Sequence, residues 1–386
     1  MSARSTSGTA IVGIGATEFS RESGRSELRL AVEAISSALA DAGLSFDDVD
    51  GLCTFDMDTN DPATVAPALG LNGVTHFWQS SYGGGGGCST VLSAAMAVTT
   101  GAADVVVAYR AMNERSGRRY GQVSGGKRRV PLALSHYTPY GIHTAAQCFA
   151  LNISRYRNTY DVTNADFAPV AVAARRHAST NPAAFFYGKP ITIDDHQASR
   201  WIVEPGLRLL DCCLESDGAV AIVITSAERA RDLRQRPVQI TAGSQGLVGP
   251  QMRDYYRSSI ISADETAVAA RKLWATSGLR PQDMSMAILY DHFTPLVLMQ
   301  IEALGFCGPG EGKDFVADGR IDLDGALPIN TNGGQLGEAY IHGMNGIAEA
   351  VRQLRGSAVN QVDDVEHVLV TSGPGVPTSA LILSPT

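Results

Sequence analysis

A β-α unit occurs twice in this chain of 386 residues, and the duplication restricts the fold more than any other feature of the sequence. Residues 10–19 (AIVGIGATEF) are typical of a strand that ends in a glycine turn, and residues 237–246 (PVQITAGSQG) resemble them. Each strand is followed by apolar residues at helical spacing, over residues 27–52 and 265–289. The helices end in matching motifs, Gly43-Leu44-x-x-x-Asp48 and Gly278-Leu279-x-x-x-Asp283. Such a duplication predicts two similar α/β halves.

We place the N-terminal half at residues 1–235 and the C-terminal half at residues 236–386. Residues from about 112 to 200 interrupt the first half, because they are rich in Tyr, His, Arg and Pro and hold few long apolar runs. We expect this insertion to cover one face of the molecule, where loops that select a substrate are commonly found. With 44% apolar and 18% charged residues, the chain has the composition of a globular protein with a sizeable core.

Charge and cysteine content exclude several classes of function. The net charge of −8 argues against a nucleic-acid partner. No apolar run approaches the roughly 18 residues of a membrane span, and the first ten residues lack a hydrophobic signal core. The six cysteines have no metal-binding spacing, so we expect reduced thiols, no metal site and a cytoplasmic protein. One basic stretch, Arg118 to Arg129, is either a solvated loop or a site for an anionic ligand or a partner loop.

Five consecutive glycines, Gly83 to Gly87, come directly before a segment with the pattern of a buried helix. Glycine inside a helix costs roughly 1 kcal/mol relative to alanine, so the run needs a physical reason. A helix N-terminus offers free backbone N–H groups and partial positive charge, and glycine lets another group come close to them. The run is therefore either a tight packing corner or the floor of an active site.

Three segments resemble the thiolase superfamily, and in particular the sterol-carrier-protein-type thiolases. They are residues 207–226, which close the first half, residues 175–186 in the insertion, and residues 327–356 near the C-terminus. The resemblance covers almost the whole chain. It implies two duplicated halves in a five-layer α-β-α-β-α stack, a homodimer through the thiolase core, and acyl-coenzyme A substrates. It implies no cofactor other than the coenzyme A that is part of the substrate.

The chain departs from that family at each catalytic position. Gly84 stands where the family has its nucleophilic cysteine. The family's His-Asp-Cys-Phe motif reads Tyr290-Asp291-His292-Phe293, and Tyr340 replaces the histidine that follows Asn-x-x-Gly-Gly. The late Cys-x-Gly reads Thr371-Ser372-Gly373. Both family histidines have thus become tyrosine, and both family cysteines are gone.

Without a thiolate there is no acyl-enzyme, so the usual Claisen condensation is excluded. Backbone N–H groups near Gly84 and Gly373 would still frame an oxyanion hole for a thioester carbonyl. Such a site suits the reversible aldol cleavage of a β-hydroxyacyl thioester, which needs a base for the hydroxyl group and an acid for the enolate carbon.

The lipid-transfer-protein-like aldolases of actinobacterial steroid side-chain degradation also resemble this chain. They share its Tyr-Asp-His-Phe and Gly-Glu-Ala-Tyr segments. This resemblance implies cleavage of a 17-hydroxy steroid C22 acyl-CoA to a 17-keto steroid and propionyl-CoA. It also implies a partner, a small OB-fold protein with a zinc ribbon from the associated acyl-CoA hydratase.

The resemblance assigns the catalytic pair to Tyr290 and Tyr340, and which is the base and which the acid stays open. His292, Asp291 and His342 are expected to support the pair or contact the substrate. A tyrosine with a lowered pKa would need a nearby donor or cation, which His292 or His342 could provide. Two alternatives remain: a catalytically inactive subunit that binds acyl-CoA or a partner, and a thiolase that uses the neighbouring Cys88.

Overall fold

The computed structural model describes residues 8–81, 83–117, 119, 135, 137–248, 263–374 and 378–386. Most of the basic stretch from Arg118 to Arg129 lies outside the described residues. Arg119 is described, and it forms an ion pair with Glu215.

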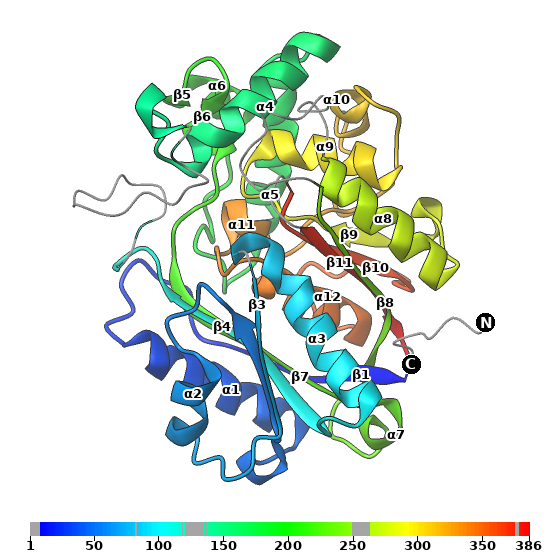
Figure 1. Cartoon of the computed structure of the whole chain (residues 1–386). Coiled ribbons are helices and arrows are strands. Elements are labelled where there is room, and N and C mark those ends of the chain that lie inside the picture. The colour runs from blue at the N-terminus through cyan, green and yellow to red at the C-terminus, as the bar shows by residue number, and fades with distance from the viewer. Residues whose placement is uncertain are drawn as a thin grey trace.

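Nine strands form one mixed sheet in the order β3-β2-β4-β7-β1-β8-β11-β10-β9 (Figure 1). The strands of one part are β1 (Thr9–Ala16), β2 (Gly51–Phe55), β3 (His76–Ser80), β4 (Val105–Asn113) and β7 (Asp217–Ser226). Those of the other part are β8 (Val238–Gly246), β9 (Met286–Ile288), β10 (Val368–Ser372) and β11 (Thr378–Pro385). The parts join where β1 and β8 pair antiparallel through Ala10 with Gln239 and Ile11 with Val238. In each part the outer strands run parallel, β3-β2-β4 and β10-β9.

The two β-α units have the same order of elements. In the first, β1 is followed by α1 (Glu27–Ala42) and β2; in the second, β8 is followed by α8 (Asp264–Ser277) and β9. Both helices end at a glycine in the left-handed conformation, Gly43 at φ 75° and Gly278 at φ 73°. Glycine adopts this conformation without steric cost, which explains why both helices stop at the matched motif.

Helices lie outside and between the two parts of the sheet. Helix α1 contacts β1, β4 and β7 on one outer face, and α8 contacts β8 and β11 on the other. Between them lie α3 (Gly86–Thr100) and α12 (Met344–Arg355), which contact strands of both parts. Their buried residues, such as Val91 and Ile347, share one hydrophobic core with Ile222 of β7 and Leu381 of β11. This is the arrangement of a five-layer α-β-α-β-α stack.

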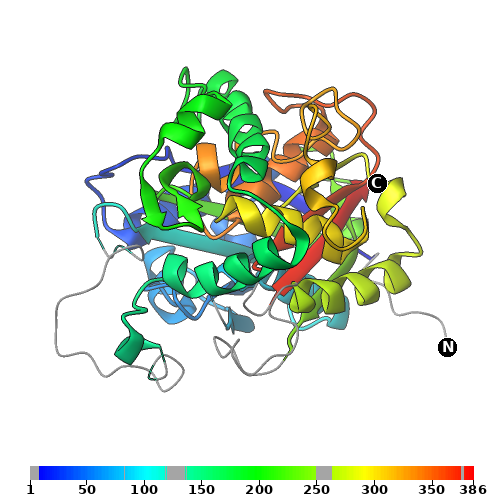
Figure 2. The same ribbon diagram turned by 90° about the horizontal axis from the view of Figure 1, so that it is seen from above.

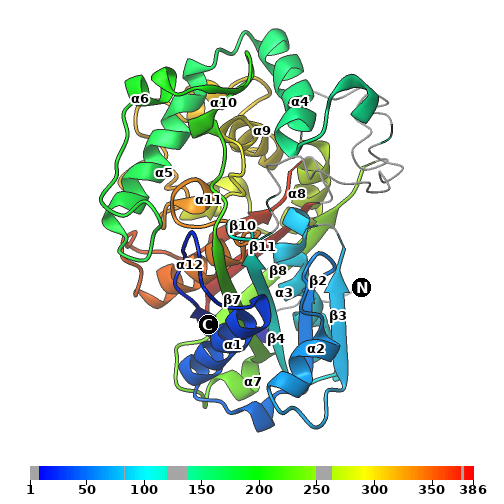
Figure 3. The ribbon, with the colours of Figure 1, turned by 90° about the vertical axis from the view of Figure 1, so that its left-hand side faces the viewer.

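The remaining helices gather mainly at two ends. Helices α4 (Ala145–Tyr160), α5 (Ala168–Thr180) and α6 (Ile193–Ala198) lie with α9 (Thr294–Leu304) and α10 (Gly312–Phe315) at the end opposite α1, α2 (Pro62–Ala68) and α7 (Ala227–Ala230) (Figure 3). Seen from above, green and yellow helices of the middle of the chain lie around the red C-terminal strands, which stay visible (Figure 2). The short α11 (Gly334–Gly337) and the hairpin of β5 (Trp201–Val203) and β6 (Leu207–Arg208) complete the elements.

None of the helices in the described part of the chain has the length and apolar character that a membrane crossing requires.

Candidate active site

Two tyrosine hydroxyls meet at the centre of the molecule. Tyr290 follows the last residues of β9, and Tyr340 follows α11. Their hydroxyl oxygens are 3.1 Å apart and share a hydrogen bond. The ring centroids are 6.4 Å apart, with the ring planes inclined at 70°. Tyr290 is 3% exposed, whereas Tyr340 keeps more of its surface accessible, so the pair has a buried and a more open member.

The glycine run lies against Tyr290 and His342. Gly84 lies in the turn just before α3, and a Cβ atom there would come within 2.2 Å of the Tyr290 hydroxyl oxygen. Gly86 and Gly87 are close to other groups: a Cβ atom would lie 2.5 Å from the Phe55 ring and 2.5 Å from Ser372 Oγ, respectively. The run is therefore tightly packed, and at Gly84 the group packed against it is Tyr290.

The main chain of Tyr290 is fixed on both sides by buried polar side chains. Its N–H donates to Thr371 Oγ1 at 3.0 Å, and its carbonyl accepts from Gln300 Nε2 at 2.9 Å. Thr371 in turn donates to Gln300 Oε1 at 2.7 Å, which closes the network. The Thr371 hydroxyl therefore helps to fix the main chain of Tyr290.

The main chain of Tyr340 is held by Ser216, the residue just before β7. Ser216 Oγ accepts from the Tyr340 N–H at 2.9 Å and donates to the Tyr340 carbonyl at 3.3 Å. Neither Ser216 nor Gln300 was singled out from the sequence. Gln300 does leave a signal, since it is an uncharged polar residue that is 0% exposed inside the apolar helix α9.

The residues that follow Tyr290 have different surroundings. Asp291 accepts from the Gln335 N–H at 2.8 Å and from the Leu336 N–H at 3.4 Å, and so it ties β9 to α11. Burial raises the pKa of Asp291 to about 6, although these hydrogen bonds act to lower it. His292 is 7% exposed and packs edge-on against Phe149, with ring centroids 4.9 Å apart. Asp291 thus fixes the segment that carries Tyr290, and His292 packs beside it.

His342 lies on the other side of the pair. Its ring centroid is 5.1 Å from that of Tyr340, at an interplanar angle of 81°. It is 3% exposed and has a φ of 49°, in the left-handed region that few non-glycine residues adopt. Arg110 of β4 contacts its ring through a hydrogen bond of 3.2 Å.

The electrostatics differ from the expectation of a tyrosine with a lowered pKa. Burial raises the pKa of both Tyr290 and Tyr340 well above the usual range. Burial also lowers the pKa of His292 to about 3 and that of His342 well below its usual range, with the positive Arg110 adding to the effect at His342. Both histidines are therefore neutral near pH 7, and neither is the cation that a phenolate would need.

Cys88 is a poor candidate for a displaced nucleophile. It is 0% exposed, and burial raises the pKa of its thiol to about 12. Its N–H donates to Ser372 Oγ at 3.0 Å, and the same hydroxyl donates to its sulfur at 3.2 Å. The reactive form of cysteine is the thiolate, which this environment suppresses. Gly373 follows Ser372 and has a φ of 78°. Ser372 is the last residue of β10, and its hydroxyl binds Cys88 in the first turn of α3.

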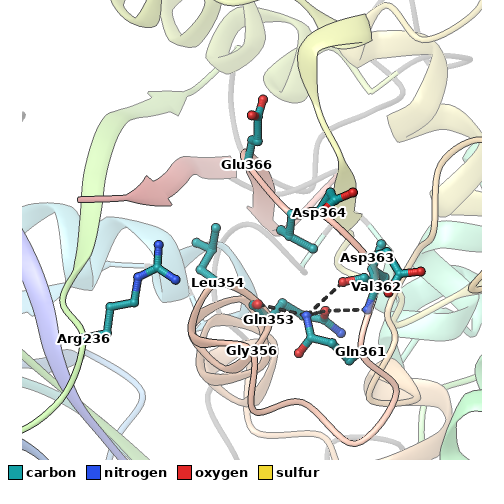
Figure 4. A pocket seen from close by; sticks show the side chains of 10 residues that line it. Arg236, Gln353, Leu354, Gly356, Gln361, Val362, Asp363, Asp364 and Glu366 are labelled. Atoms are coloured by element: carbon teal, nitrogen blue, oxygen red, sulfur yellow. Dashed lines mark hydrogen bonds between the residues drawn. The ribbon is translucent and has the colours of Figure 1, made fainter.

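A separate hollow of about 610 Å³ lies beyond the C-terminal end of α12 (Figure 4). It is lined by Arg236, by the acidic residues Asp363, Asp364 and Glu366, and by Gln353 and Gln361. Gln361 donates to Gln353 Oε1 at 3.0 Å, and Gln353 Nε2 donates to the Asn360 carbonyl at 2.7 Å, so both amides have hydrogen-bond partners. The tyrosine pair remains the better candidate for a site of chemistry, because its titratable groups converge and are buried.

Comparison with known proteins gives a consistent result. A family model described as "Thiolase C-terminal domain-like" matches residues 251–384. The 17-hydroxy-3-oxo-4-pregnene-20-carboxyl-CoA lyase of Mycobacterium tuberculosis is 62% identical over 97% of this chain and 98% of its own length. The steroid side-chain-cleaving aldolase of Thermomonospora curvata is 57% identical, over 97% of each chain.

Solved structures agree. The Ltp2-ChsH2(DUF35) aldolase is 55% identical over 98% of both chains and superposes with a TM-score of 0.93. A thiolase and a thiolase-like protein that are only 14% and 20% identical superpose with TM-scores of 0.72, which confirms the predicted α/β thiolase fold. The chain therefore belongs to the thiolase superfamily, in its SCP2-thiolase-like branch, and is a carbon–carbon lyase of the aldolase type on a thiolase scaffold.

Proposed function

We propose that the chain cleaves a 17-hydroxy steroid C22 acyl-CoA to a 17-keto steroid and propionyl-CoA, with Tyr290 and Tyr340 as the acid and base and without a covalent intermediate. The names of the two relatives at 62% and 57% identity support the steroid substrate. The observation that carries the mechanism is the 3.1 Å contact between two buried phenols at the glycine that replaces a nucleophile.

Both phenols are neutral at physiological pH, because burial raises the pKa of each. A neutral pair can pass a proton along its hydrogen bond. The phenol beside the substrate takes the proton of the β-hydroxyl as it gives its own proton to the second phenol. In the same concerted transfer the second phenol releases its own proton toward Cα, so it never holds two protons. The Cα–Cβ bond breaks, its electron pair develops as the thioester enolate, and Cα takes that proton. Both tyrosines end neutral, and the proton lost by the hydroxyl reappears on Cα.

Backbone N–H groups near Gly84 and Gly373 would bind the thioester oxygen as it gains charge. His292 and Asp291 support the strand end that carries Tyr290, and the oxyanion role of the two glycines is part of this proposal. Which tyrosine faces the hydroxyl group stays open.

The direct test is incubation of the chain with the 17-hydroxy steroid C22 acyl-CoA, with and without an OB-fold partner protein. We expect equal amounts of 17-keto steroid and propionyl-CoA, measured by liquid chromatography and mass spectrometry. The matched control is the same thioester without the 17-hydroxyl group, which has no proton to start the cleavage and should stay intact. Tight binding of the hydroxylated thioester with no product under either condition would contradict the proposal and favour an inactive binding subunit.

We also propose two protein partners. One is a small OB-fold protein with a zinc ribbon, supported by the Ltp2-ChsH2(DUF35) complex formed by a homologue. The other is a second copy of the chain. Strand β3 is the outermost strand of the sheet and carries Phe77 and Trp78, which are 70% and 51% exposed. An exposed edge strand with large apolar side chains favours pairing with another strand.

Replacement of Phe77 and Trp78 by aspartate is expected to convert the homodimer into a monomer of 40.7 kDa, because two added charges per chain would have to be buried at the edge. Analytical ultracentrifugation measures the mass. Tyr187→Asp is the matched control, since Tyr187 is 53% exposed but lies outside β3. A dimer that survives the double replacement would show that β3 is not the interface.

A further inference from the structure

Arg110 makes a buried ion pair that no step of the proposed cleavage uses. Arg110 Nη1 lies 2.9 Å from Asp58 Oδ2, with the two side chains 2% and 0% exposed. Asp58 also accepts from the Ala111 N–H at 3.1 Å and from the Asn60 N–H at 2.9 Å. The carboxylate therefore has a fixed position, and it fixes the guanidinium in turn.

The second contact of Arg110 determines the chemical state of His342. Arg110 Nε is 3.2 Å from His342 Nδ1. A guanidinium remains protonated and has only donors, so Nδ1 must accept. A histidine whose Nδ1 accepts is neutral, and its one hydrogen is on Nε2. The geometry alone thus excludes both the protonated ring and the other tautomer.

The His342 ring lies beside Tyr340 and beside the start of the glycine run. It packs against the Tyr340 ring, and its Cε1 atom is 3.6 Å from where a Cβ atom on Gly83 would be. Cε1 is bonded to both ring nitrogens, so Nε2 is one bond away from the atom that faces the turn with Gly83 and Gly84. In the proposed function the backbone N–H groups near Gly84 bind the thioester oxygen, so the His342 ring lies on the side of the site where that oxygen would gain negative charge.

We propose that Arg110 and Asp58 lock His342 in the Nε2–H tautomer, and that His342 donates this hydrogen to the thioester oxygen as the enolate forms. His342 is then a catalytic residue, whereas Arg110 and Asp58 are positioning residues. The inference rests on the proposed retro-aldol reaction and adds a neutral donor to the backbone groups of the oxyanion site.

Two substitutions separate this role from a structural one. His342→Gln places an amide N–H₂ near the former Nε2, and His342→Asn places its amide near the former Nδ1, where it can accept from Arg110. Asparagine is also well suited to the φ of 49°, so His342→Asn should fold at least as well as His342→Gln. Loss of one donor of this type typically lowers kcat by about 10²–10³-fold.

We expect His342→Asn to lose about 10²–10³-fold in kcat with little change in KM, and His342→Gln to recover most of the loss. The ¹⁵N spectrum of histidine-labelled wild-type protein should show His342, assigned by its loss in His342→Gln, as a pure Nε2–H tautomer. The Arg110→Met, Asp58→Asn double variant, which leaves no unpaired charge, should show a mixture of tautomers.

Three results would overturn the inference: an active His342→Asn with an inactive His342→Gln, full activity in both variants, or an Nδ1–H or protonated His342 in the wild type. Each of them leaves the cleavage reaction itself standing, because wild-type turnover is measured in the same assay. Absence of wild-type turnover would contradict the proposed function instead.

Discussion

Tyr290→Phe and Tyr340→Phe are each expected to lower kcat for the cleavage by about 10²–10⁴-fold, the usual contribution of a residue that transfers a proton. Each change removes one hydroxyl from the 3.1 Å hydrogen bond and interrupts the path between the β-hydroxyl group and Cα. The rings remain, so their packing against His292 and His342 should persist. The measurement is steady-state turnover with propionyl-CoA as the product, together with the thermal unfolding midpoint of each variant.

Tyr156→Phe is the matched control for the loss of a buried hydroxyl. Tyr156 is 0% exposed and donates to Glu302 between α4 and α9, away from the pair. Removal of its hydroxyl should cost roughly 1 kcal/mol of stability and leave kcat unchanged. Wild-type turnover in either Tyr290→Phe or Tyr340→Phe would contradict a proton path shared by the two phenols. So would a variant with both changes whose loss in kcat equals the product of the two single losses, because that result means that the phenols act independently.

The large-scale features could be predicted because they follow from local patterns. Duplicated strand and helix motifs indicated two α/β halves, and the motifs that contain Tyr290 and Tyr340 indicated a thiolase scaffold that lacks its nucleophile. The fold is confirmed by the comparisons. The catalytic roles of the two tyrosines stay predictions, although their hydroxyls do lie together.

The contacts that position these residues could not be predicted, since they join distant parts of the chain. The hydrogen bond from Arg110 to His342 spans 232 residues, and that from Tyr290 to Thr371 spans 81. Burial also decides the charge of each group: the sequence allowed His292 or His342 to be a cation, whereas desolvation keeps both neutral. Neither effect leaves a periodic pattern in the sequence.

The glycine at residue 84 and the tyrosine at residue 290 are neighbours in space. At the sequence level Gly84 and Tyr290 are separate departures from the thiolase pattern. In the structure the Tyr290 hydroxyl occupies the space of a side chain at residue 84, with 2.2 Å to the position of a Cβ atom. Real Cβ contacts do not come this close, so a nucleophile at residue 84 and a phenol at residue 290 exclude one another. In the proposed mechanism, a residue without a side chain at position 84 is therefore a condition for placing the Tyr290 hydroxyl.

Gly84→Ala should therefore impair catalysis through Tyr290. Gly84 lies in a turn before a helix, and alanine can adopt its backbone conformation. The strain therefore falls on the contact with Tyr290, and the added methyl group must displace the hydroxyl. A shift of about 1 Å at a reacting group can cost about 10²-fold in rate, and the overpacking should cost about 1–3 kcal/mol of stability. Gly73→Ala is the control, because a Cβ atom there meets nothing within 4 Å.

A double-mutant cycle tests whether the loss passes through the hydroxyl group. In the Tyr290→Phe background the hydroxyl is gone, so Gly84→Ala should lower kcat little further, and the two effects should be far from additive. The measurements are kcat for both single variants and the double variant, with unfolding midpoints to separate stability from rate. Additive losses in kcat, or a Gly84→Ala variant as active as Gly73→Ala, would show that residue 84 and Tyr290 act independently, and the coupling between the missing nucleophile and the phenol would have to be abandoned.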